Sequence, residues 1–321
     1  MQACSSASWK GNVRGAMMRS MNFADRLADA QRRKDSIAVL GVDPQLNAPD
    51  ACGIPDGYTL TRFCCETVEA CAPHVVAIKP QLAFYEARGI DGMRALAEVL
   101  AAARGLGLIT IADGKRGDIG STSAAYAEAF LGTGDFGCDA VTINPYLGSD
   151  AMMPFVVKAR EGRGVLVLVK TSNPSSGEFQ DLPVGEGPVW EAVATRVRGL
   201  GSDFIGDCGL SAIGAVVGAT YPRQARRARE LMPDAVILVP GYGAQGATAV
   251  DAIAAARSDG LGTIVSASRS LMYAYRTRPG VAPPVAAAEA AAAMRLKLNR
   301  ALETVVKGSA RGMPTAGVTA G

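Results

Sequence analysis

Eight short apolar runs recur along this chain, and the stretches between them have the periodicity of amphipathic helices. This alternation most constrains the fold, because unbroken apolar strands separated by helices are typical of a parallel sheet covered on its outer face. Eight such units over roughly 250–280 residues favour a closed barrel over an open doubly wound sheet. The sequence therefore predicts a single (β/α)₈ TIM barrel with an eight-stranded parallel core. The runs are 37–43, 75–79, 108–113, 140–144, 164–170, 213–218, 235–239 and 263–266.

The barrel is expected to occupy residues 21–306, with a flanking segment at each end. Residues 1–20 are basic, contain no acids and lack the apolar core of a signal peptide. They predict a disordered leader, although a transit peptide or an upstream start codon would give the same pattern. Residues 307–321 predict a disordered tail. Helices are expected at 23–33, 92–104, 122–131, 189–199, 222–231 and 247–256.

Two long segments interrupt the alternation of strands and helices. Segments 44–58 and 173–188 are rich in Pro, Gly and Ser, and each follows a predicted strand. Loops at that end of a barrel surround the active site, so both segments are candidate lids.

Composition narrows the possible functions. The net charge is +3 and the basic residues are scattered, which argues against a nucleic-acid partner. No apolar stretch approaches the roughly 18 residues that a membrane span needs. The seven cysteines form no C-x-x-C pair. We therefore expect reduced thiols in a cytoplasmic protein with no membrane partner.

A single histidine, His74, excludes several kinds of catalytic site. A zinc site built from histidines is impossible, and a Ser-His-Asp or Cys-His triad would have to use His74. His74 begins an apolar strand, which in a barrel is the end associated with stability rather than catalysis. Acid–base chemistry is therefore expected from Asp, Glu, Lys or Tyr.

Polar side chains stand at the ends of five predicted strands. In a barrel, the active site forms at the carboxyl ends of the strands. One such residue alone would be explained by a solvated turn, but five together predict a functional site. They are Asp43, Lys79, Asp113, Asn144 and Lys170, the last followed by Thr171 and Ser172.

The densest cluster is Asp113-Gly-Lys115-Arg-Gly-Asp118-Ile119-Gly. Asp113 and Lys115 are two residues apart, so on an extended strand their side chains share one face. Asp118 follows where the chain turns through glycines into a helix. A lysine between carboxylates stays protonated, which suits a fixed positive charge and proton donor rather than a Schiff-base nucleophile. An ion-pair network that closes a turn would give the same pattern.

A glycine-rich segment follows the seventh predicted strand. In Pro240-Gly-Tyr-Gly-Ala-Gln-Gly246, the glycines match G-x-G-x-x-G, but the next strand does not end in the acid that a dinucleotide site needs. Barrels often bind phosphate with the loops after strands 7 and 8, through backbone N–H groups. Arg269, just past the eighth strand, would add a bidentate charge. We therefore predict a phosphate site here.

Taken in order, these motifs resemble the orotidine 5′-phosphate decarboxylase family over about residues 21–305. Asp113-Gly-Lys115-Arg-Gly-Asp118-Ile119-Gly is similar to the family's D-x-K-x-x-D-I signature, in the form written by its longer-chain bacterial (type 2) branch. The supporting segments are Gly-Val-Asp43-Pro, Ile-Lys79-Pro, Asn144-Pro-Tyr, Thr-Ser172-Asn-Pro, Val-Gly-Ala-Thr-Tyr-Pro, Pro-Gly-Tyr-Gly-Ala-Gln245-Gly and Arg269.

The resemblance implies a cytoplasmic homodimer that decarboxylates orotidine 5′-monophosphate (OMP) to UMP without a metal or cofactor. It implies catalytic roles for Asp113, Lys115 and Asp118, with Asp113 and Lys115 beside the scissile carboxylate. Asp118, Ile119 and Thr122 would reach across the dimer interface into the partner's site. The remaining implied substrate contacts are Asp43 and Lys79 to the ribose, Ser172 to the pyrimidine, Gln245 and Arg269 to the 5′-phosphate, and Pro240.

Two alternatives remain open from the sequence. A Mg²⁺-dependent relative that acts on ketose phosphates would need a further acidic ligand at a strand end. Glu66, Glu69 and Glu86 fall in predicted helices or turns, so none is a candidate. A non-catalytic phosphate-binding barrel would have no use for a lysine held between carboxylates.

Overall fold

The computed structural model describes residues 21–45, 53–243 and 246–311, with side chains through residue 306. All eight predicted runs form strands, and these close into a parallel barrel in the order β1-β10-β9-β8-β5-β4-β3-β2. The predicted TIM barrel is therefore confirmed. The strands are β1 (Ala38–Val42), β2 (Ala77–Pro80), β3 (Ile109–Arg116), β4 (Ala140–Ile143), β5 (Gly164–Lys170), β8 (Ser211–Val217), β9 (Ala235–Pro240) and β10 (Thr263–Ala267).

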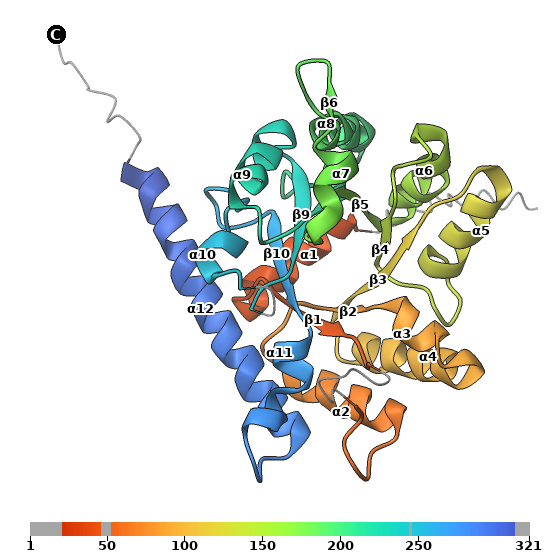
Figure 1. Ribbon diagram of the computed structural model, residues 1–321, viewed down its shortest axis with the longest axis vertical. Helices are drawn as coiled ribbons and strands as arrows, with labels where there is room; N and C mark the ends of the chain where they lie inside the picture. The colour runs from red at the N-terminus through yellow and green to blue at the C-terminus, as the bar shows by residue number, and fades with distance from the viewer. Residues whose placement is uncertain (1–20, 46–52, 244–245, 312–321) are drawn as a thin grey trace, which may run out of the picture.

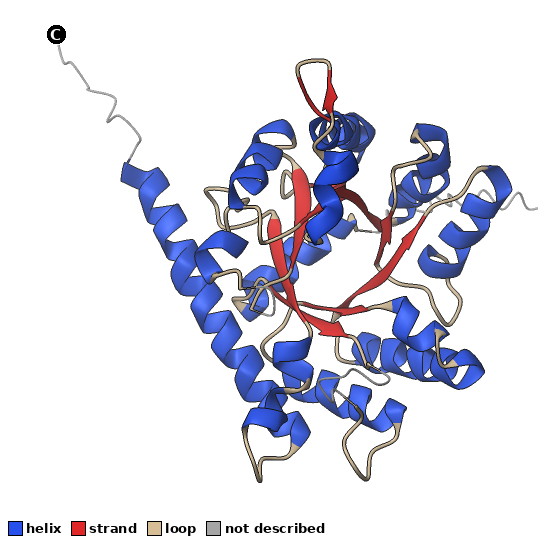
Figure 2. Ribbon diagram, in the orientation of Figure 1, coloured by secondary structure: helices blue, strands red, loops and turns tan. Residues whose placement is uncertain are grey.

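Helices surround the barrel, as Figure 2 shows. The six predicted helices are all present, and the described residues form six more. The helices are α1 (Phe23–Lys34), α2 (Leu60–Cys71), α3 (Leu82–Glu86), α4 (Gly89–Gly105), α5 (Gly120–Leu131), α6 (Ser149–Val156), α7 (Gly177–Gln180), α8 (Val189–Gly201), α9 (Pro222–Leu231), α10 (Ala249–Ala252), α11 (Arg269–Met272) and α12 (Pro283–Arg311). Short 3₁₀ turns cover Val157–Glu161, Pro174–Ser176, Ser202–Phe204 and Ala274–Thr277.

The strands are apolar on both faces because neither face meets water. Every residue of β1, β4 and β8 is buried. One face of each strand packs inside the barrel and the other against the helices, which is why the sequence shows continuous apolar runs instead of alternation.

Helix α12 is the longest helix and lies along one side of the barrel (Figure 1). Ala287, Ala291, Met294 and Leu298 are buried at helical spacing and form its inner face. The helix continues through residues 307–311, into the segment for which the sequence predicts a disordered tail. Once a helix is anchored, each added residue gains a backbone hydrogen bond, and the glycine and serine there do not stop it. Residues 1–20 and 312–321 lie outside the described residues.

No helix in the described part of the chain is long and apolar enough to cross a membrane.

Helix α10 is shorter than the expected 247–256. Thr248 caps its start in a reciprocal capping box with Asp251, and the helix ends after Ala252. The guanidinium of Arg229 donates a hydrogen bond to the carbonyl of Ala255 at 2.8 Å. Arg229 of α9 thus binds the turn that follows α10.

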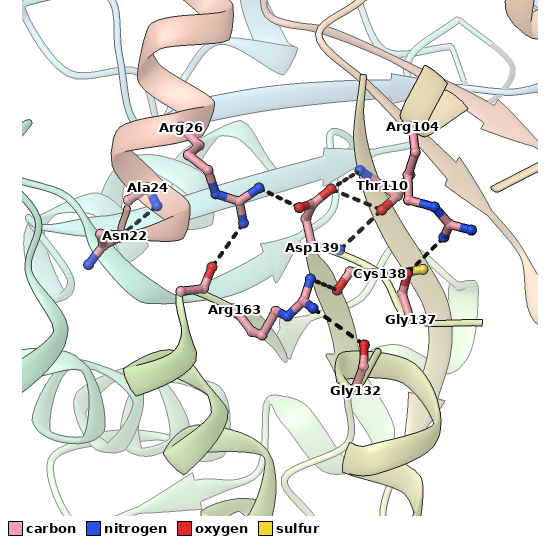
Figure 3. Close-up of polar contacts among 11 residues, drawn as sticks. Asn22, Ala24, Arg26, Arg104, Thr110, Gly132, Gly137, Cys138, Asp139 and Arg163 are labelled. Carbon is pink, nitrogen blue, oxygen red and sulfur yellow. Dashed lines mark hydrogen bonds and ion pairs between the residues drawn. The ribbon is translucent and has the colours of Figure 1, made fainter. Parts of the chain in front are cut away.

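A polar network ties together the amino-terminal end of the barrel (Figure 3). Asp139 accepts hydrogen bonds from the backbone N–H and hydroxyl of Thr110 at 2.8 and 3.0 Å. Its other oxygen is ion-paired with Arg26, which also donates to the carbonyl of Gly162 at 2.9 Å. The network links α1 to β3, β4 and the start of β5. His74 lies at this same end, before β2, as expected for a structural histidine.

Replacing Asp139 with alanine should destabilise the fold without changing catalysis. The change leaves the Thr110 hydroxyl and the Arg26 guanidinium without their acceptor. We expect the free energy of unfolding in urea to fall by about 1–3 kcal/mol. The control is Asp29→Ala, which breaks an exposed helical ion pair with Arg33 and should cost no more than about 0.5 kcal/mol. Loss of turnover without loss of stability would contradict the structural role.

Candidate active site

The closed barrel brings the predicted site residues side by side at the carboxyl ends of neighbouring strands. β9 pairs with β10, β10 with β1, β1 with β2, and β2 with β3. Residues far apart in sequence therefore follow one another around the rim. In that order they are Pro240, Arg269, Asp43, Lys79 and Asp113.

The centre of the site is a carboxylate shared by two ammonium groups. The Lys79 Nζ lies 2.5 Å from one Asp113 oxygen, and the Lys115 Nζ lies 2.7 Å from the other. Lys79 and Asp113 are buried, whereas the Lys115 side chain is 43% exposed. The structure thus brings Asp113, Lys115 and Lys79 together, with the Lys115 side chain the most exposed of the three.

These charges determine one another's ionisation. Burial by itself would raise the pKa of Asp113, but the ammonium groups of Lys79 and Lys115 outweigh it and hold the pKa well below its usual range. Burial would likewise lower the pKa of Lys79, but Asp113 and Asp43 outweigh it and raise that pKa. The cluster therefore carries a buried carboxylate and a buried ammonium at neutral pH.

Lys115 is not on a regular extended strand, contrary to the sequence argument. Its φ is +47°, in the left-handed region, and the pairing of β3 with β4 shifts register between Ala112 and Arg116. The backbone N–H of Lys115 donates to the Thr142 hydroxyl at 3.0 Å, and that hydroxyl donates to Asp113 at 3.0 Å. The two charged side chains still meet, but through a bulge.

Asp43 offers an unused acceptor next to this cluster. Its Oδ1 is buried and has no hydrogen-bond partner within the described residues. Its backbone carbonyl accepts a hydrogen bond from the Tyr273 hydroxyl at 3.3 Å. A buried acceptor without a partner is costly unless a ligand or water supplies a donor. A ligand hydroxyl would satisfy it.

Asp118, Ile119 and Thr122 are not joined to the cluster in this chain. The Asp118 carboxylate accepts from the backbone N–H of Ile119 at 2.7 Å, and no ion pair links it to Lys115 among the described residues. Ile119 is 60% exposed, and Thr122 is exposed in the first turn of α5. Within one chain, Asp118 therefore makes a local contact at the start of α5.

The segment after β5 is more ordered than the predicted loop. It contains a 3₁₀ turn, α7 and a two-stranded hairpin of β6 (Pro183–Val184) and β7 (Gly187–Pro188), which projects from the barrel (Figure 1). Ser172 is half-buried at its start. The other candidate lid, 44–58, falls partly outside the described residues.

A buried lysine anchors this segment. Lys170 is fully buried, lies 2.8 Å from both oxygens of Asp181, and has its Nζ 4.9 Å from the ring centroid of Tyr221. The Gln180 side chain also accepts a hydrogen bond from the Thr171 backbone N–H and donates one to the Thr171 hydroxyl. The sequence marked Lys170 as a strand-end charge but gave no sign of Asp181, because the pairing depends on how the segment folds back.

The glycine-rich segment has the backbone that its sequence requires. Gly241, Gly243 and Gly246 all have positive φ, a region that residues with a side chain rarely adopt. Arg269 is exposed at the start of α11 and lines an open cavity of about 890 Å³ together with Gly243. Gln245 lies outside the described residues.

The acidic residues weighed as metal ligands lie elsewhere. Glu66 and Glu69 lie in α2, and Glu86 ends α3, where it is ion-paired with Arg116. Over the described ranges, no three His, Cys, Asp or Glu side chains are grouped so that they could hold a metal ion.

The chain is similar to known orotidine 5′-phosphate decarboxylases in sequence and in structure. Residues 56–282 match the model of the orotidine 5′-phosphate decarboxylase / HUMPS family. An orotidine 5′-phosphate decarboxylase from Rhodopirellula baltica is 43% identical over 271 residues, covering 80% of this chain and 90% of that protein. One from Deinococcus radiodurans is 44% identical over 282 residues, covering 87% and 98%. The structure of Leishmania donovani OMP decarboxylase superposes with a TM-score of 0.70 at 32% identity, covering 88% and 99%.

The lowered pKa of Asp113 predicts how stability depends on pH. Because the folded pKa lies below the unfolded value, ionised Asp113 contributes stability that is fully present above about pH 4 and is lost as the pH falls through the folded pKa. Asp113→Asn cannot titrate and should be less stable than wild type at neutral pH. Urea unfolding from neutral to acid pH should show this difference shrinking below about pH 4. A difference that stays constant across this range would contradict the charge assignment.

Proposed function

The chain belongs to the orotidine 5′-phosphate decarboxylase / HUMPS family, and we propose that it converts OMP to UMP and CO₂, the last step of de novo pyrimidine biosynthesis. The observation that carries the proposal is the Lys115 ammonium, held 2.7 Å from a buried carboxylate and open to the barrel mouth. This arrangement supplies a fixed cation where the reaction develops negative charge.

The chemistry needs such a cation. Breaking the bond from C6 of the pyrimidine to its carboxylate releases CO₂ and leaves an electron pair on C6 that the ring carbonyls cannot delocalise. Stabilisation must then be electrostatic, from a charge already in position. Lys115 stabilises this pair and transfers a proton to C6, giving UMP, and regains its proton from solvent. Asp113 fixes the ammonium and lies beside the substrate carboxylate.

The remaining contacts follow the order of strands around the rim. Asp43 and Lys79 bind the ribose hydroxyls, which is supported by the unpartnered buried oxygen of Asp43. Ser172 binds the pyrimidine, and Arg269 binds the 5′-phosphate. Gln245 completes the phosphate contacts from the glycine-rich segment, which begins after Pro240, itself a substrate contact.

Segment 173–188 is proposed to close over the bound substrate. It carries exposed apolar side chains at Phe179, Leu182 and Val184, which would be covered on closure. Phosphate binding would provide the energy that holds the segment closed and removes water from the reacting atoms.

The active site is proposed to be shared between two copies of the chain. Ile119, Tyr146 and Leu147 are 60%, 85% and 45% exposed and follow β3 and β4, close to where Asp118 leaves the strand. A second copy would cover this apolar surface. Asp118, Ile119 and Thr122 would then enter the partner's site.

A cytoplasmic location is proposed as well. The five cysteines of the described residues are all free thiols, as expected in a reducing compartment.

Replacing Lys115 with alanine tests the proposed reaction. The variant keeps the ribose and phosphate contacts but loses the cation and the proton donor. We expect UMP still to bind while kcat falls by at least about 100-fold, measured as UMP formation from OMP. Lys297→Ala, which removes an exposed lysine on α12, is the matched control and should behave as wild type.

The same assay separates the metal-dependent alternative. Exhaustive chelation should leave OMP decarboxylation unchanged. Activity that disappears with EDTA and returns with Mg²⁺ would favour a ketose-phosphate reaction, and a chain that binds UMP but never forms it would favour a non-catalytic barrel.

Mixing two inactive variants tests the shared site. In a two-fold dimer, each site would combine one chain's Lys115 with the other chain's Asp118. When Lys115→Ala chains exchange with Asp118→Ala chains, a mixed dimer has one site with both lesions and one with neither. Random pairing should therefore restore about a quarter of wild-type activity.

The control mixes Lys115→Ala with Asp113→Ala. Both residues lie on β3 of one chain, so every site of a mixed dimer keeps one lesion and no activity should return. If the Lys115→Ala and Asp118→Ala mixture also stays inactive after verified subunit exchange, the shared site is wrong.

A further inference from the structure

We propose that Thr142 is a positioning residue for the decarboxylation, whose hydroxyl holds the Lys115 backbone in its bulged conformation and so aims the ammonium. The inference rests on the roles proposed for Lys115 and Asp113. It assigns a function to an uncharged residue of β4.

Thr142 lies opposite the bulge. In the pairing of β3 with β4, Ala112 matches Val141 and Arg116 matches Ile143. Residues 113–115 of β3 therefore face the single residue Thr142 of β4. Backbone hydrogen bonds between the strands cannot pair three residues of β3 with one residue of β4. A side chain must therefore supply a hydrogen bond that the bulge removes from the backbone.

The Thr142 hydroxyl makes two hydrogen bonds to residues of this bulge. Its oxygen accepts from the Lys115 backbone N–H at 3.0 Å, and its proton is donated to Asp113 Oδ1 at 3.0 Å. That same oxygen of Asp113 is the one paired with the Lys115 ammonium. Thr142 thus holds two groups: the backbone of Lys115, and the Asp113 carboxylate that pairs with the Lys115 ammonium.

The conformation at Lys115 needs such support. A φ of +47° is costly for a residue with a side chain and persists only where the surroundings hold it. Thr142 is 1% exposed, so no water competes for these bonds. Without the hydroxyl, the Lys115 N–H and Asp113 each lose a partner, and the backbone is free to relax toward an extended strand, which would withdraw the ammonium.

The same barrel contains a matched residue with no link to the site. Thr110 on β3 is also 1% exposed, its hydroxyl donates to Asp139 at 3.0 Å, and it accepts the Asp139 backbone N–H at 3.1 Å. Figure 3 shows this second threonine–aspartate pair at the amino-terminal end. Thr110→Val and Thr142→Val therefore remove the same groups, one far from Lys115 and one beside it.

The experiment compares Thr142→Val, Thr142→Ser and Thr110→Val in the full chain. We expect Thr142→Val to lower kcat by about 100-fold, as displacement of a reacting group by about 1 Å does, while UMP affinity and the KM for OMP change little. Thr142→Ser keeps the hydroxyl and should restore most of kcat. Thr110→Val should lower thermal stability to a similar extent as Thr142→Val but leave kcat unchanged.

Three results would overturn the inference. One is a Thr142→Val enzyme that keeps its kcat, another is a serine variant as impaired as the valine variant, and the third is an equal loss of kcat in Thr110→Val. If Thr142→Val does not fold, Thr142→Ala replaces it, and failure of both to fold would assign the hydroxyl to stability alone. Failure of the proposed function is separate, because the wild-type chain would then form no UMP from OMP. Failure of the role proposed for Lys115 would show as activity in Lys115→Ala.

Discussion

The carboxylate of Asp113, shared between two ammonium groups, is the interaction on which the site depends. Its oxygens are divided, one to the buried Lys79 and one to the half-exposed Lys115. A buried charge is tolerated only when it is paired, so the barrel interior can hold Lys79 because Asp113 is there. The same pairing keeps a cation at the mouth with its position fixed before any substrate arrives.

Each end of the barrel has a buried threonine hydroxyl that donates a hydrogen bond to an aspartate. At the amino-terminal end, the Thr110 hydroxyl bridges to Asp139, whose charge is taken up by Arg26. At the carboxyl end, Thr142 bridges to Asp113. In the first network, the charge of Asp139 is paired with that of Arg26, so the pair stabilises the fold. The second lies at the carboxyl ends of the strands, and its Lys115, carried on the bulge in β3, is 43% exposed.

The segment over the carboxyl end is built in a related way. Lys170 is completely buried, and Asp181, half exposed, is its carboxylate partner. The attraction between them ties α7 to the end of β5, next to Ser172. A segment held by one ion pair and a few side-chain hydrogen bonds can be ordered and still be able to open, which suits the closing role proposed for it.

The sequence by itself determined the barrel, since eight apolar runs with helices between them fit few other folds. It also determined the Asp113–Lys115 cluster and the glycine-rich turn, because these are local: neighbouring residues and positive-φ glycines need no distant partner. Only the tertiary structure decided the bulge at Lys115, the hydrogen bonds of Thr142 and the pairing of Lys170 with Asp181. Those contacts join residues whose proximity depends on which strands are neighbours and on how a loop folds back. Local sequence periodicity predicts neither.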